Sequence, residues 1–523
     1  MTAREEIKNL IEKAVRKLYG KEVEVEIEKP AEMTYGDYAT NVAMTLKKNP
    51  QEIANVIKYR AKRGEEEGKA LFDSTIIEKV EVKNGFINFF LSKEYLQKQV
   101  KDILKEKDRF GRVKIGKGKK VNVEFISANP TGPLHVGNGR AGFFADALSN
   151  VLNGAGYKVT REYYINDMGR QIKFLDNSLK GEEPSYKNEY IEELKAKEEK
   201  DARKAVEYII GKIQETTDKM GIKFDKWFYE SRLYPKETND ILKLLKKNNL
   251  TYEKEGAVWF KSSEFGDDKD RVLVKSKEKT TYLEETYLLS DIAYLKNKFK
   301  RGFEHLIIFL GAEHHGYTAR LSAAVQALGY DKNKLKPIIL QLVDLLEKGQ
   351  RLKMSKRAGI YVTMNELLDE VGVDVARFFF LTKSPGSHLL FDLDLAKKQS
   401  EKNPVYYVQY AYARICSIIR KYGNSKLQSP NYKLINHPSE LRLIKQLIRL
   451  PEIIEDTSKD YQVQRLPQYA MDLAGIFHQF YRDCRVISED KELTKARLFL
   501  VQATKIILKN TLDLMGISAP GKM

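Results

Sequence analysis

The stretch from residue 121 to residue 165 constrains the fold more than any other part of the chain. Residues 121–126 are rich in β-branched and aromatic side chains, as in a buried strand. A loop rich in proline and glycine follows, then a helical pattern to about Asn153 and a second strand-like run at 157–165. A strand, a helix and a strand in so short a span form a βαβ unit, whose strands are parallel. We therefore predict a doubly wound parallel sheet with a ligand crevice at the carboxyl ends of its strands.

Two more apolar runs extend this sheet. Residues 305–310 and 337–342 have the composition of buried strands, with a helical pattern at 317–328 between them. Between about residues 181 and 279 the periodicity weakens and charged side chains dominate, which indicates an insertion. We therefore assign residues 110–372 to an α/β domain with a Rossmann-like parallel sheet that is split by this insertion.

The two flanking regions have different patterns. Residues 1–109 combine helical segments with short alternating runs, such as 23–27 and 86–90, and predict an N-terminal α+β domain. Residues 373–523 are almost wholly helical in pattern and predict a C-terminal all-α helical bundle. Its expected helices span 374–383, 405–422, 440–454 and 494–514.

Composition limits the compartment and the partners. A formal net charge of +18 favours a polyanionic partner, although lysine-rich surfaces also serve solubility or thermal stability. The two cysteines, Cys416 and Cys484, lack Cys-x-x-Cys spacing, which argues for a reducing compartment and against a thiolate metal site. Glu5, Glu6 and Glu12 argue against a transit peptide. Since no apolar run approaches the roughly 18 residues of a membrane span, we expect a soluble cytoplasmic protein.

The first chemical motif is NPTGPLHVGN at 129–138, where a strand end turns into a helix start. Free backbone N–H groups and the positive end of the helix dipole attract phosphate at such a point. Gly137 would let a base or ribose approach the backbone. His135 could donate hydrogen bonds to phosphate oxygens that gain charge in a transition state. The alternative is a capped core helix with an incidental histidine.

The second motif is the basic run LKMSKRAG at 352–359. Three cations around a serine could clamp a triphosphate and neutralise a departing pyrophosphate. In isolation, a solvated charge run would be the favoured explanation of such a segment. The pairing of both motifs, in this order and on opposite halves of an interrupted parallel sheet, favours nucleotide chemistry.

These two motifs resemble the HIGH and KMSKS signatures of class I aminoacyl-tRNA synthetases. The resemblance implies catalytic roles for His135, Asn138, Lys353 and Lys356. Asn138 departs from the usual histidine of the signature, because it can donate a hydrogen bond but cannot carry charge. The ATP-binding residues that the resemblance implies are Pro133, His135, Gly137, Asn138, Gly311, His314, Met354, Ser355 and Lys356.

Acidic residues near the expected crevice favour arginine as the amino acid. A guanidinium needs planar carboxylate partners, since a buried unpaired cation is very unfavourable. Glu124 lies on the first strand, five residues before Asn129. Asp291 follows Tyr287 by four residues, so Tyr287 and Asp291 would share one face if this segment is helical. These segments and the loop 311–317 resemble arginyl-tRNA synthetases. The arginine-binding residues implied are Glu124, Asn129, Tyr287, Asp291 and His314.

The flanking regions also resemble this family. The segment YGDYATN at 35–41 resembles its N-terminal domain, which contacts the D-arm of tRNA, and DVAR at 374–377 resembles the DALR start of its anticodon-binding region. Aromatic side chains can stack on anticodon bases, although tyrosines at helical spacing often pack in a core instead. The tRNA-binding candidates are Asp37, Tyr38, Asn41, Tyr410, Tyr481 and Met515.

The resemblance implies an arginine--tRNA ligase. Such an enzyme activates L-arginine with ATP, accompanied by Mg²⁺, and then transfers it to the 3′-terminal ribose of tRNA(Arg), with AMP and pyrophosphate released. It further implies a monomer without a structural metal that needs bound tRNA before activation. The competing assignments are a class I synthetase for lysine or cysteine, a nucleotidyl transferase that never touches RNA, and an inactive RNA-binding paralogue.

Overall fold

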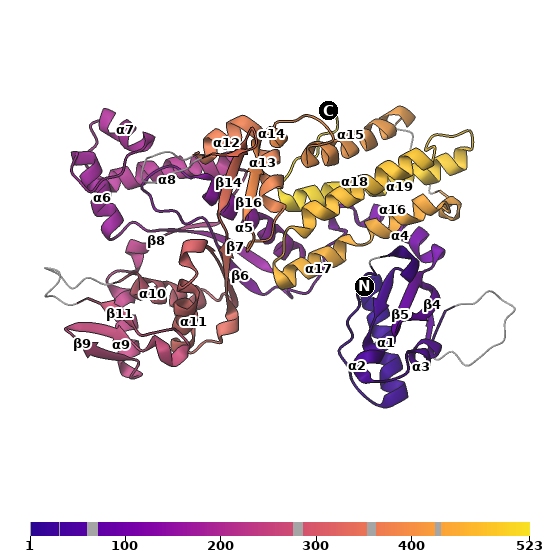
Figure 1. Ribbon diagram of the computed structural model, residues 1–523, viewed down its shortest axis with the longest axis horizontal. Coiled ribbons are helices and arrows are strands. Elements are labelled where there is room, and N and C mark those ends of the chain that lie inside the picture. Colours follow the sequence, from indigo (N-terminus) through magenta and orange to yellow (C-terminus); the bar gives the residue numbers. More distant parts are fainter. Residues whose placement is uncertain (1, 31, 60–71, 276–285, 353–361, 424–429) are drawn as a thin grey trace.

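The computed structural model describes residues 2–30, 32–59, 72–275, 286–352, 362–423 and 430–523. A parallel sheet lies in the middle of the molecule, and a long helical region extends from it (Figure 1). The N-terminal domain lies below the far end of this helical region, and the segments α9 to α11 lie on the opposite side of the molecule. The predicted fold class is confirmed in all three regions.

The central sheet contains five parallel strands in the order β13-β12-β6-β7-β8 among the described residues. The first of them in sequence, β6, is central: Glu124 lies opposite Glu162 on one side and Ile308 on the other. The chain therefore builds the sheet outward from β6 in one direction and then in the other, so a switch point lies between β6 and β12. The strands span Lys120–Glu124 (β6), Lys158–Ile165 (β7), Lys226–Tyr229 (β8), His305–Gly311 (β12) and Leu335–Leu340 (β13).

Helix α5 (Val136–Gly154) connects β6 to β7 and is largely buried. Phe144 packs against Phe309 of β12, and Phe143 packs against Phe380 in the helical region. The helix that follows the first motif is thus fixed between the sheet and the C-terminal helices. Its covered position explains why the sequence there is apolar on most sides.

The segment between β7 and β12 is not only an insertion, because it also supplies a strand of the central sheet. It holds α6 (Arg170–Lys180), α7 (Glu189–Ala196) and α8 (Ala202–Lys219), and then β8 joins the central sheet. A second part holds α9 (Lys236–Lys247) and an antiparallel sheet of β9 (Thr251–Lys254), β10 (Ala257–Phe260) and β11 (Arg271–Val274). The helices α10 (Tyr287–Lys300) and α11 (Tyr317–Ala327) flank β12.

The N-terminal domain is an α+β unit, as predicted. The run 86–90 lies in a strand, but the run 23–27 does not: only its neighbour Glu28 forms an isolated bridge, to Ala39. The elements are α1 (Ala3–Tyr19), β1 (Tyr38–Thr40), α2 (Val42–Leu46), α3 (Pro50–Val56), β2 (Ile57–Tyr59), β3 (Phe72–Ser74), β4 (Ile77–Lys83), β5 (Phe86–Leu91) and α4 (Lys93–Glu106).

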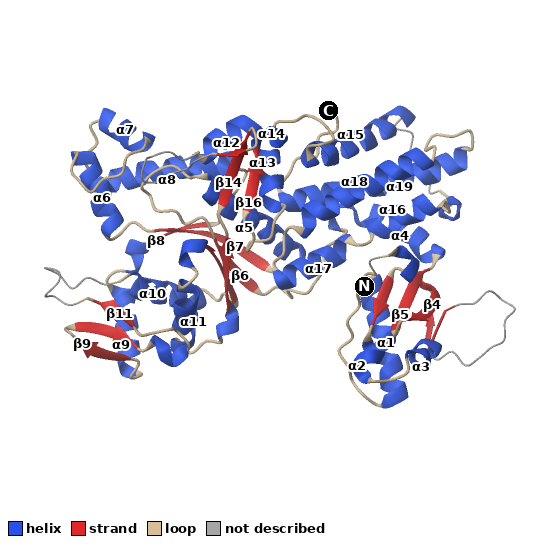
Figure 2. Ribbon diagram, viewed as in Figure 1, coloured by secondary structure: helices blue, strands red, loops and turns tan. Residues whose placement is uncertain are grey.

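The C-terminal region is helical, as Figure 2 shows. One expected helix, 440–454, is wrong as a single element, because Pro451 lacks the N–H that would continue the preceding turn and instead opens a new helix. The elements after β13 are β14 (Val343–Glu347), β15 (Gln350–Arg351), α12 (Met364–Val371), α13 (Val373–Leu381), β16 (Leu389–Asp392), α14 (Leu393–Ala396), α15 (Pro404–Tyr422), α16 (Pro438–Leu447), α17 (Leu450–Asp460), α18 (Arg465–Asp483) and α19 (Lys491–Met515).

A buried arginine joins three of these regions. Arg377 of α13 is 1% exposed and pairs with Asp146 of α5 at 2.8 Å. It also donates to the carbonyl oxygens of Met220 and Gly221, after α8, and of Met515, at the end of α19. The guanidinium therefore satisfies carbonyl groups that two helix ends leave without partners. None of the helices within the described ranges is long and apolar enough to cross a membrane.

Candidate functional site

The first motif forms the start of α5. His135 is the N-cap residue, and its Nδ1 accepts the backbone N–H of Gly137 at 3.1 Å. Asn138 returns the contact, because its Oδ1 accepts the backbone N–H of His135 at 3.0 Å. This is a reciprocal capping box in which the asparagine has a structural task that needs no charge. A Cβ at Gly137 would lie 2.9 Å from the imidazole, so a side chain there would push His135 away.

The residues after the second motif run beside the first motif. His135 forms a β-bridge with Thr363, and the N–H of Met364 donates to the carbonyl oxygen of Leu134 at 2.7 Å. On the other side, the N–H of Leu352 donates to Leu345 of β14 at 2.9 Å. The motif residues Lys353, Met354, Ser355 and Lys356 lie outside the described residues. The ends of the segment that carries them are therefore held near the start of α5 and at the β14 hairpin.

Two of the predicted arginine-binding residues, Tyr287 and Asp291, lie on helix α10, as the sequence indicated. Tyr287 opens this helix, is 47% exposed, and donates its hydroxyl to Gln171 at the start of α6. Asp291 follows one turn later, is partly buried, and accepts a hydrogen bond from the hydroxyl of Tyr317. Tyr287 therefore presents an accessible ring one helical turn before the carboxyl group of Asp291.

Glu124 ends β6 and is 8% exposed. Its carboxylate pairs with Lys298, which lies two turns beyond Asp291 on α10 and is fully buried. A sequence-predicted arginine ligand therefore already has one internal cation. The structure brings Glu124 and Asp291 close enough for their charges to interact, because the Glu124 carboxylate contributes to raising the pKa of Asp291.

The sequence analysis missed Glu230. This residue follows β8 directly, in a short 3-10 helix (Glu230–Leu233), and is 1% exposed. Burial raises its pKa to about 7, and nearby Asp167 adds to the effect. Burial likewise raises the pKa of Asp291 to about 7, with smaller contributions from Glu230 and Glu124 that outweigh Lys298. The position of Glu230 directly after a parallel strand was the available signal, but that strand, β8, has only four residues and was not recognised.

The remaining candidates lie around the same edge of the sheet. Gly311 ends β12, and His314 follows in a 3-10 turn with its side chain 56% exposed. Asn129 is exposed, and its carbonyl oxygen accepts the N–H of Thr131 at 2.8 Å. Pro133 is half-buried just before the helix start. These residues lie at or after the end of β12 or after β6, and because these neighbouring strands are parallel, the loops that follow them lie at the same edge of the sheet.

Three family models match the chain in succession. The "Arginyl tRNA synthetase N terminal domain" matches residues 5–91, the "tRNA synthetases class I (R), catalytic domain" matches 99–197 and 185–383, and the "DALR anticodon binding domain" matches 408–523. The chain belongs to the arginyl-tRNA synthetase family. It is therefore an enzyme, a ligase of class I. These matches favour arginine over the lysine, cysteine and nucleotidyl transferase alternatives.

Individual relatives agree with this family. The arginine--tRNA ligase of Caldanaerobacter subterraneus subsp. tengcongensis is 42% identical over 100% of this chain and 99% of its own length. That of Carboxydothermus hydrogenoformans is 41% identical over 96% and 95%. A putative arginyl-tRNA synthetase structure from Campylobacter jejuni gives a TM-score of 0.74 at 33% identity, over 83% of this chain and 100% of the other. The Thermus thermophilus arginyl-tRNA synthetase structure gives a TM-score of 0.79 at 22% identity, with both chains covered in full, and shows the shared fold.

Asp37 and Tyr38, two of the N-terminal candidates of this synthetase, lie where its N-terminal domain meets the helical region. Asp37 forms an ion pair with Lys445 of α16 at 2.7 Å. Tyr38 is 5% exposed and donates its hydroxyl to Glu452 of α17 at 2.8 Å. Asn41 is exposed at the start of α2. Asp37 and Tyr38 thus take part in domain docking, and their contact with the D-arm stays a prediction.

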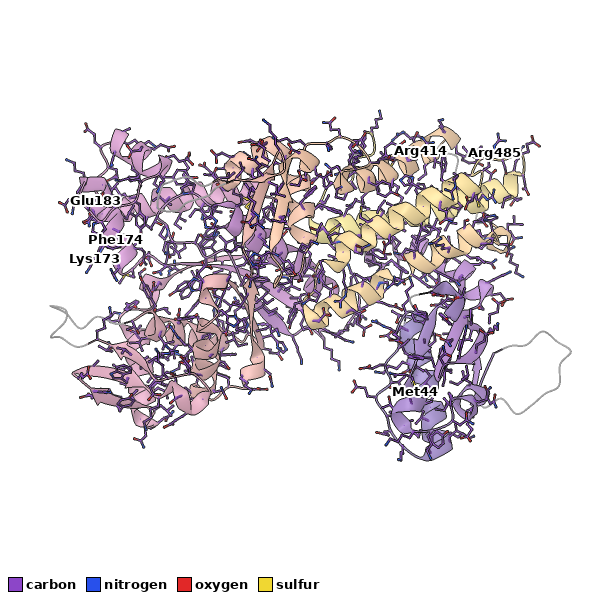
Figure 3. The ribbon with its side chains drawn as sticks, viewed as in Figure 1. Met44, Lys173, Phe174, Glu183, Arg414 and Arg485 are labelled. Carbon is purple, nitrogen blue, oxygen red and sulfur yellow. The ribbon has the colours of Figure 1, made fainter. Side chains whose placement is uncertain are left out.

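The C-terminal candidates of the synthetase separate into surface and core. Tyr410 is 41% exposed and stacks on Tyr406 of the same helix and on His478 of α18, at 6.4 and 6.1 Å between ring centroids. Tyr481 of α18 lies under the guanidinium of Arg414, 4.8 Å from its ring centroid. Figure 3 shows Arg414 on the outer side of the helical region.

Met515, by contrast, is fully buried at the end of α19. Its carbonyl oxygen accepts from Arg377, so its backbone is fixed as well. The aromatic surface across α15 and α18 therefore offers stacking area, whereas the Met515 side chain belongs to the core in this conformation. Tyr406 and His478 were not recognised from the sequence, since nothing local showed that α15 and α18 are neighbours.

Proposed function

We propose that this ligase activates L-arginine with ATP and transfers it to tRNA(Arg) at the carboxyl edge of its central sheet. The observation that carries the proposal is the pair of carboxyl groups on Asp291 and Glu230. Both have a pKa raised to about 7, and neither forms an ion pair with a lysine or arginine among the described residues. Buried carboxyls in this state favour a cationic ligand.

Arginine fits this pocket by charge. Its guanidinium and α-ammonium groups supply two cations. Asp291 and Glu230 supply two carboxyls, neither of which forms an ion pair with a lysine or arginine among the described residues. Glu124 adds a further acceptor oxygen from the end of β6. Tyr287 and Asn129, both exposed at the same edge, are placed to bind the remaining polar groups and the aliphatic stem of the substrate.

ATP would bind at the start of α5. The positive end of the helix dipole there favours phosphate, and His135 and Asn138 fix the geometry of that helix end. We assign Lys353 and Lys356 to the β- and γ-phosphates, Met354 and Ser355 to the adjoining nucleotide contacts, and Gly311 and His314 to the border between adenosine and arginine. Mg²⁺ would arrive with the triphosphate and is not held by a protein site of its own.

The reaction proceeds in two displacements. The arginine carboxylate attacks the α-phosphate of ATP in line, forming arginyl-adenylate and releasing pyrophosphate. A ribose hydroxyl at the 3′ end of tRNA then attacks the adenylate carbonyl, and AMP leaves. The protein contributes mainly position and charge neutralisation, which is sufficient for phosphoryl chemistry of this kind.

The tRNA would lie along the helical region and the N-terminal domain. The net charge of +18 favours a polyanion, and the Tyr406, Tyr410 and His478 surface offers platforms for unstacked bases. Asp37, Tyr38 and Asn41 are proposed at the D-arm, and Tyr410 and Tyr481 at the anticodon. We further infer that the enzyme acts in the cytoplasm as a monomer.

One assay tests this function: exchange of pyrophosphate into ATP, run with each amino acid, with and without total tRNA. We expect exchange with arginine and with no other amino acid, and only when tRNA is present. Exchange driven by lysine, or by arginine equally well without tRNA, would contradict the proposal.

A substitution tests the pocket itself. Asp291→Ala removes a carboxyl that forms no ion pair within the described part of the chain. We therefore expect the KM for arginine to rise by about 100-fold or more while the KM for ATP stays within about twofold, consistent with the loss of a charged hydrogen bond. The matched control is Asp240→Ala, which removes an exposed carboxyl from neighbouring α9. A selective loss of ATP affinity in Asp291→Ala would show that the pocket is misassigned.

A further inference from the structure

Lys298 is a buried cation that the reaction described above does not use. Its side chain is fully buried on α10, and its ammonium pairs with the Oε2 atom of Glu124. It also lies 4.2 Å from the ring centroid of Tyr294, one turn earlier. A lysine ammonium is rarely buried without a charged partner, so Glu124 and Lys298 depend on one another.

The other buried carboxylate beneath the pocket has its own cation. Glu162 of β7 accepts two hydrogen bonds from Arg301, at 2.6 and 2.7 Å, together with one from Asn122 at 3.0 Å and one from the hydroxyl of Tyr294. Lys298 also attracts Glu162, but only through space, since the hydrogen-bonded ion pair of Glu162 is with Arg301. The hydrogen-bonded partner of Lys298 is Glu124, the carboxylate whose charge also acts on Asp291.

We propose that Lys298 is a positioning residue that sets the charge of the arginine pocket by neutralising Glu124 from inside the protein. Three carboxyls meet at this pocket, and Lys298 balances one of them. Asp291 and Glu230 then remain for a substrate with two cations. This inference rests on the proposed function, because it names what tunes the same pocket.

The pairing also orients Glu124. Lys298 engages only Oε2, and Oε1 has no hydrogen-bond partner among the described residues, while the Glu124 side chain keeps 11% of its surface exposed. One oxygen is thus held from the protein side, and the other remains for a guanidinium N–H. A freely rotating glutamate would lose conformational entropy when it binds the substrate, which would weaken binding.

The charges around Asp291 come from several elements. Tyr317 of α11 donates to it, Glu230 and Glu124 repel it from the end of β8 and the end of β6, and Lys298 of its own helix attracts it. Tyr164 of β7 lies near as well. Because the effects of Glu124 and Lys298 on Asp291 have opposite signs, removing one of them shifts the titration of Asp291, and removing both together restores the balance.

Four proteins test this: the natural chain, Lys298→Met, Glu124→Gln and the double variant. The measurement is the arginine KM as a function of pH, with the ATP KM in parallel. We expect the pH at which arginine affinity is lost on acidification to rise in Lys298→Met, to fall in Glu124→Gln, and to return near the natural value in the double variant. Lys298→Met should also raise the arginine KM about fivefold at pH 7, the effect of raising the pKa of Asp291 from about 7 to about 8.

The matched control is Lys300→Met, which removes the same charge from the exposed end of the same helix and should leave the pH profile unchanged. Equal profiles in all four proteins, or shifts of the same sign in both single variants, would overturn the role of Lys298. If Lys298→Met does not fold, Glu124→Gln and the double variant still decide, since the second substitution must reverse the shift of the first. A natural chain without arginine-dependent exchange would instead overturn the proposed function.

Discussion

Two residues of the proposed arginine site, Asp291 and Glu230, should make arginine binding sensitive to pH near neutrality. Burial raises the pKa of each to about 7 in the free enzyme, so both are largely protonated below that pH. A cation binds the ionised carboxyls and must displace those protons. We expect the arginine KM to rise as the pH falls through about 7 and proton release on binding to grow over the same range, measured by steady-state kinetics and by calorimetry in two buffers.

The sign for stability is the opposite of that for a paired carboxylate. Because the folded pKa lies above the unfolded value of about 4, the two groups lower the free energy of unfolding progressively as the pH rises from about 4 to 7. Arginine should remove this penalty. A thermal shift by arginine that is larger at pH 8 than at pH 6 is therefore expected, and an equal shift at both would contradict the assigned pKa values.

Among single residues, the sequence indicated part of the proposed arginine site. Glu124 and Asp291 were found because a guanidinium requires carboxylates and because both lie next to clear elements. Glu230 was not found, since its strand is four residues long and lies in a charge-dense stretch. Lys298 was not found either, because a lysine in a helical pattern is usually exposed, and only the fold shows that it turns inward.

Helix ends decide several features at the scale of elements. Gly516 closes α19 in the left-handed region at φ 69°, and a Cβ there would lie 2.8 Å from Cζ of Arg377. Gly20 closes α1 in the same way at φ 63°, with nothing within 4 Å of such a Cβ. The two glycines have the same backbone requirement and differ only in what surrounds them.

Alanine at these two positions should separate backbone strain from packing. Gly20→Ala should cost about 1 kcal/mol from the left-handed backbone alone. Gly516→Ala should cost several kcal/mol, because the methyl group displaces the guanidinium that binds Met515, Met220 and Asp146. Denaturant unfolding, followed by helical signal, measures both. Equal losses would show that Arg377 yields freely.

Element prediction succeeded where periodicity extends over several turns and failed where one residue overrides it. The patterns at 405–422 and 494–514 correspond to α15 and α19. The pattern at 440–454 is continuous in polarity, yet Pro451 divides it into α16 and α17. Alternation at 23–27 gave no strand, because pairing with a neighbour, which the sequence does not specify, is what makes a strand.

The N-terminal domain is held to the rest of the molecule by buried polar contacts. Glu452 of α17 accepts the Tyr38 hydroxyl, and burial raises the pKa of this carboxyl. Arg4 of α1 adds ion pairs to Glu455 at 2.8 Å and to Asp456 at 2.9 Å. Such an interface binds through a few groups that each need their partner.

Removing one hydroxyl should therefore loosen the whole domain. Tyr38→Phe leaves the Glu452 carboxyl buried without its donor, at a cost of about 1–3 kcal/mol. We expect faster proteolysis between the domains and a larger radius of gyration by X-ray scattering. Tyr19→Phe is the control, because the Tyr19 hydroxyl donates to exposed Glu52 within the same domain. An unchanged scattering profile in Tyr38→Phe would mean that docking does not depend on this bond.

The position of β6 in the middle of the sheet has a consequence for synthesis on the ribosome. Its first neighbour, β7, emerges soon afterwards, but its second neighbour, β12, is complete only once Gly311 has been made. Until then one edge of a buried strand keeps its amide and carbonyl groups unpaired, and such edges invite association with other nascent chains. Shielding by a chaperone should therefore matter most while the polypeptide lies between these two lengths, and slow codons in that interval would prolong the exposure.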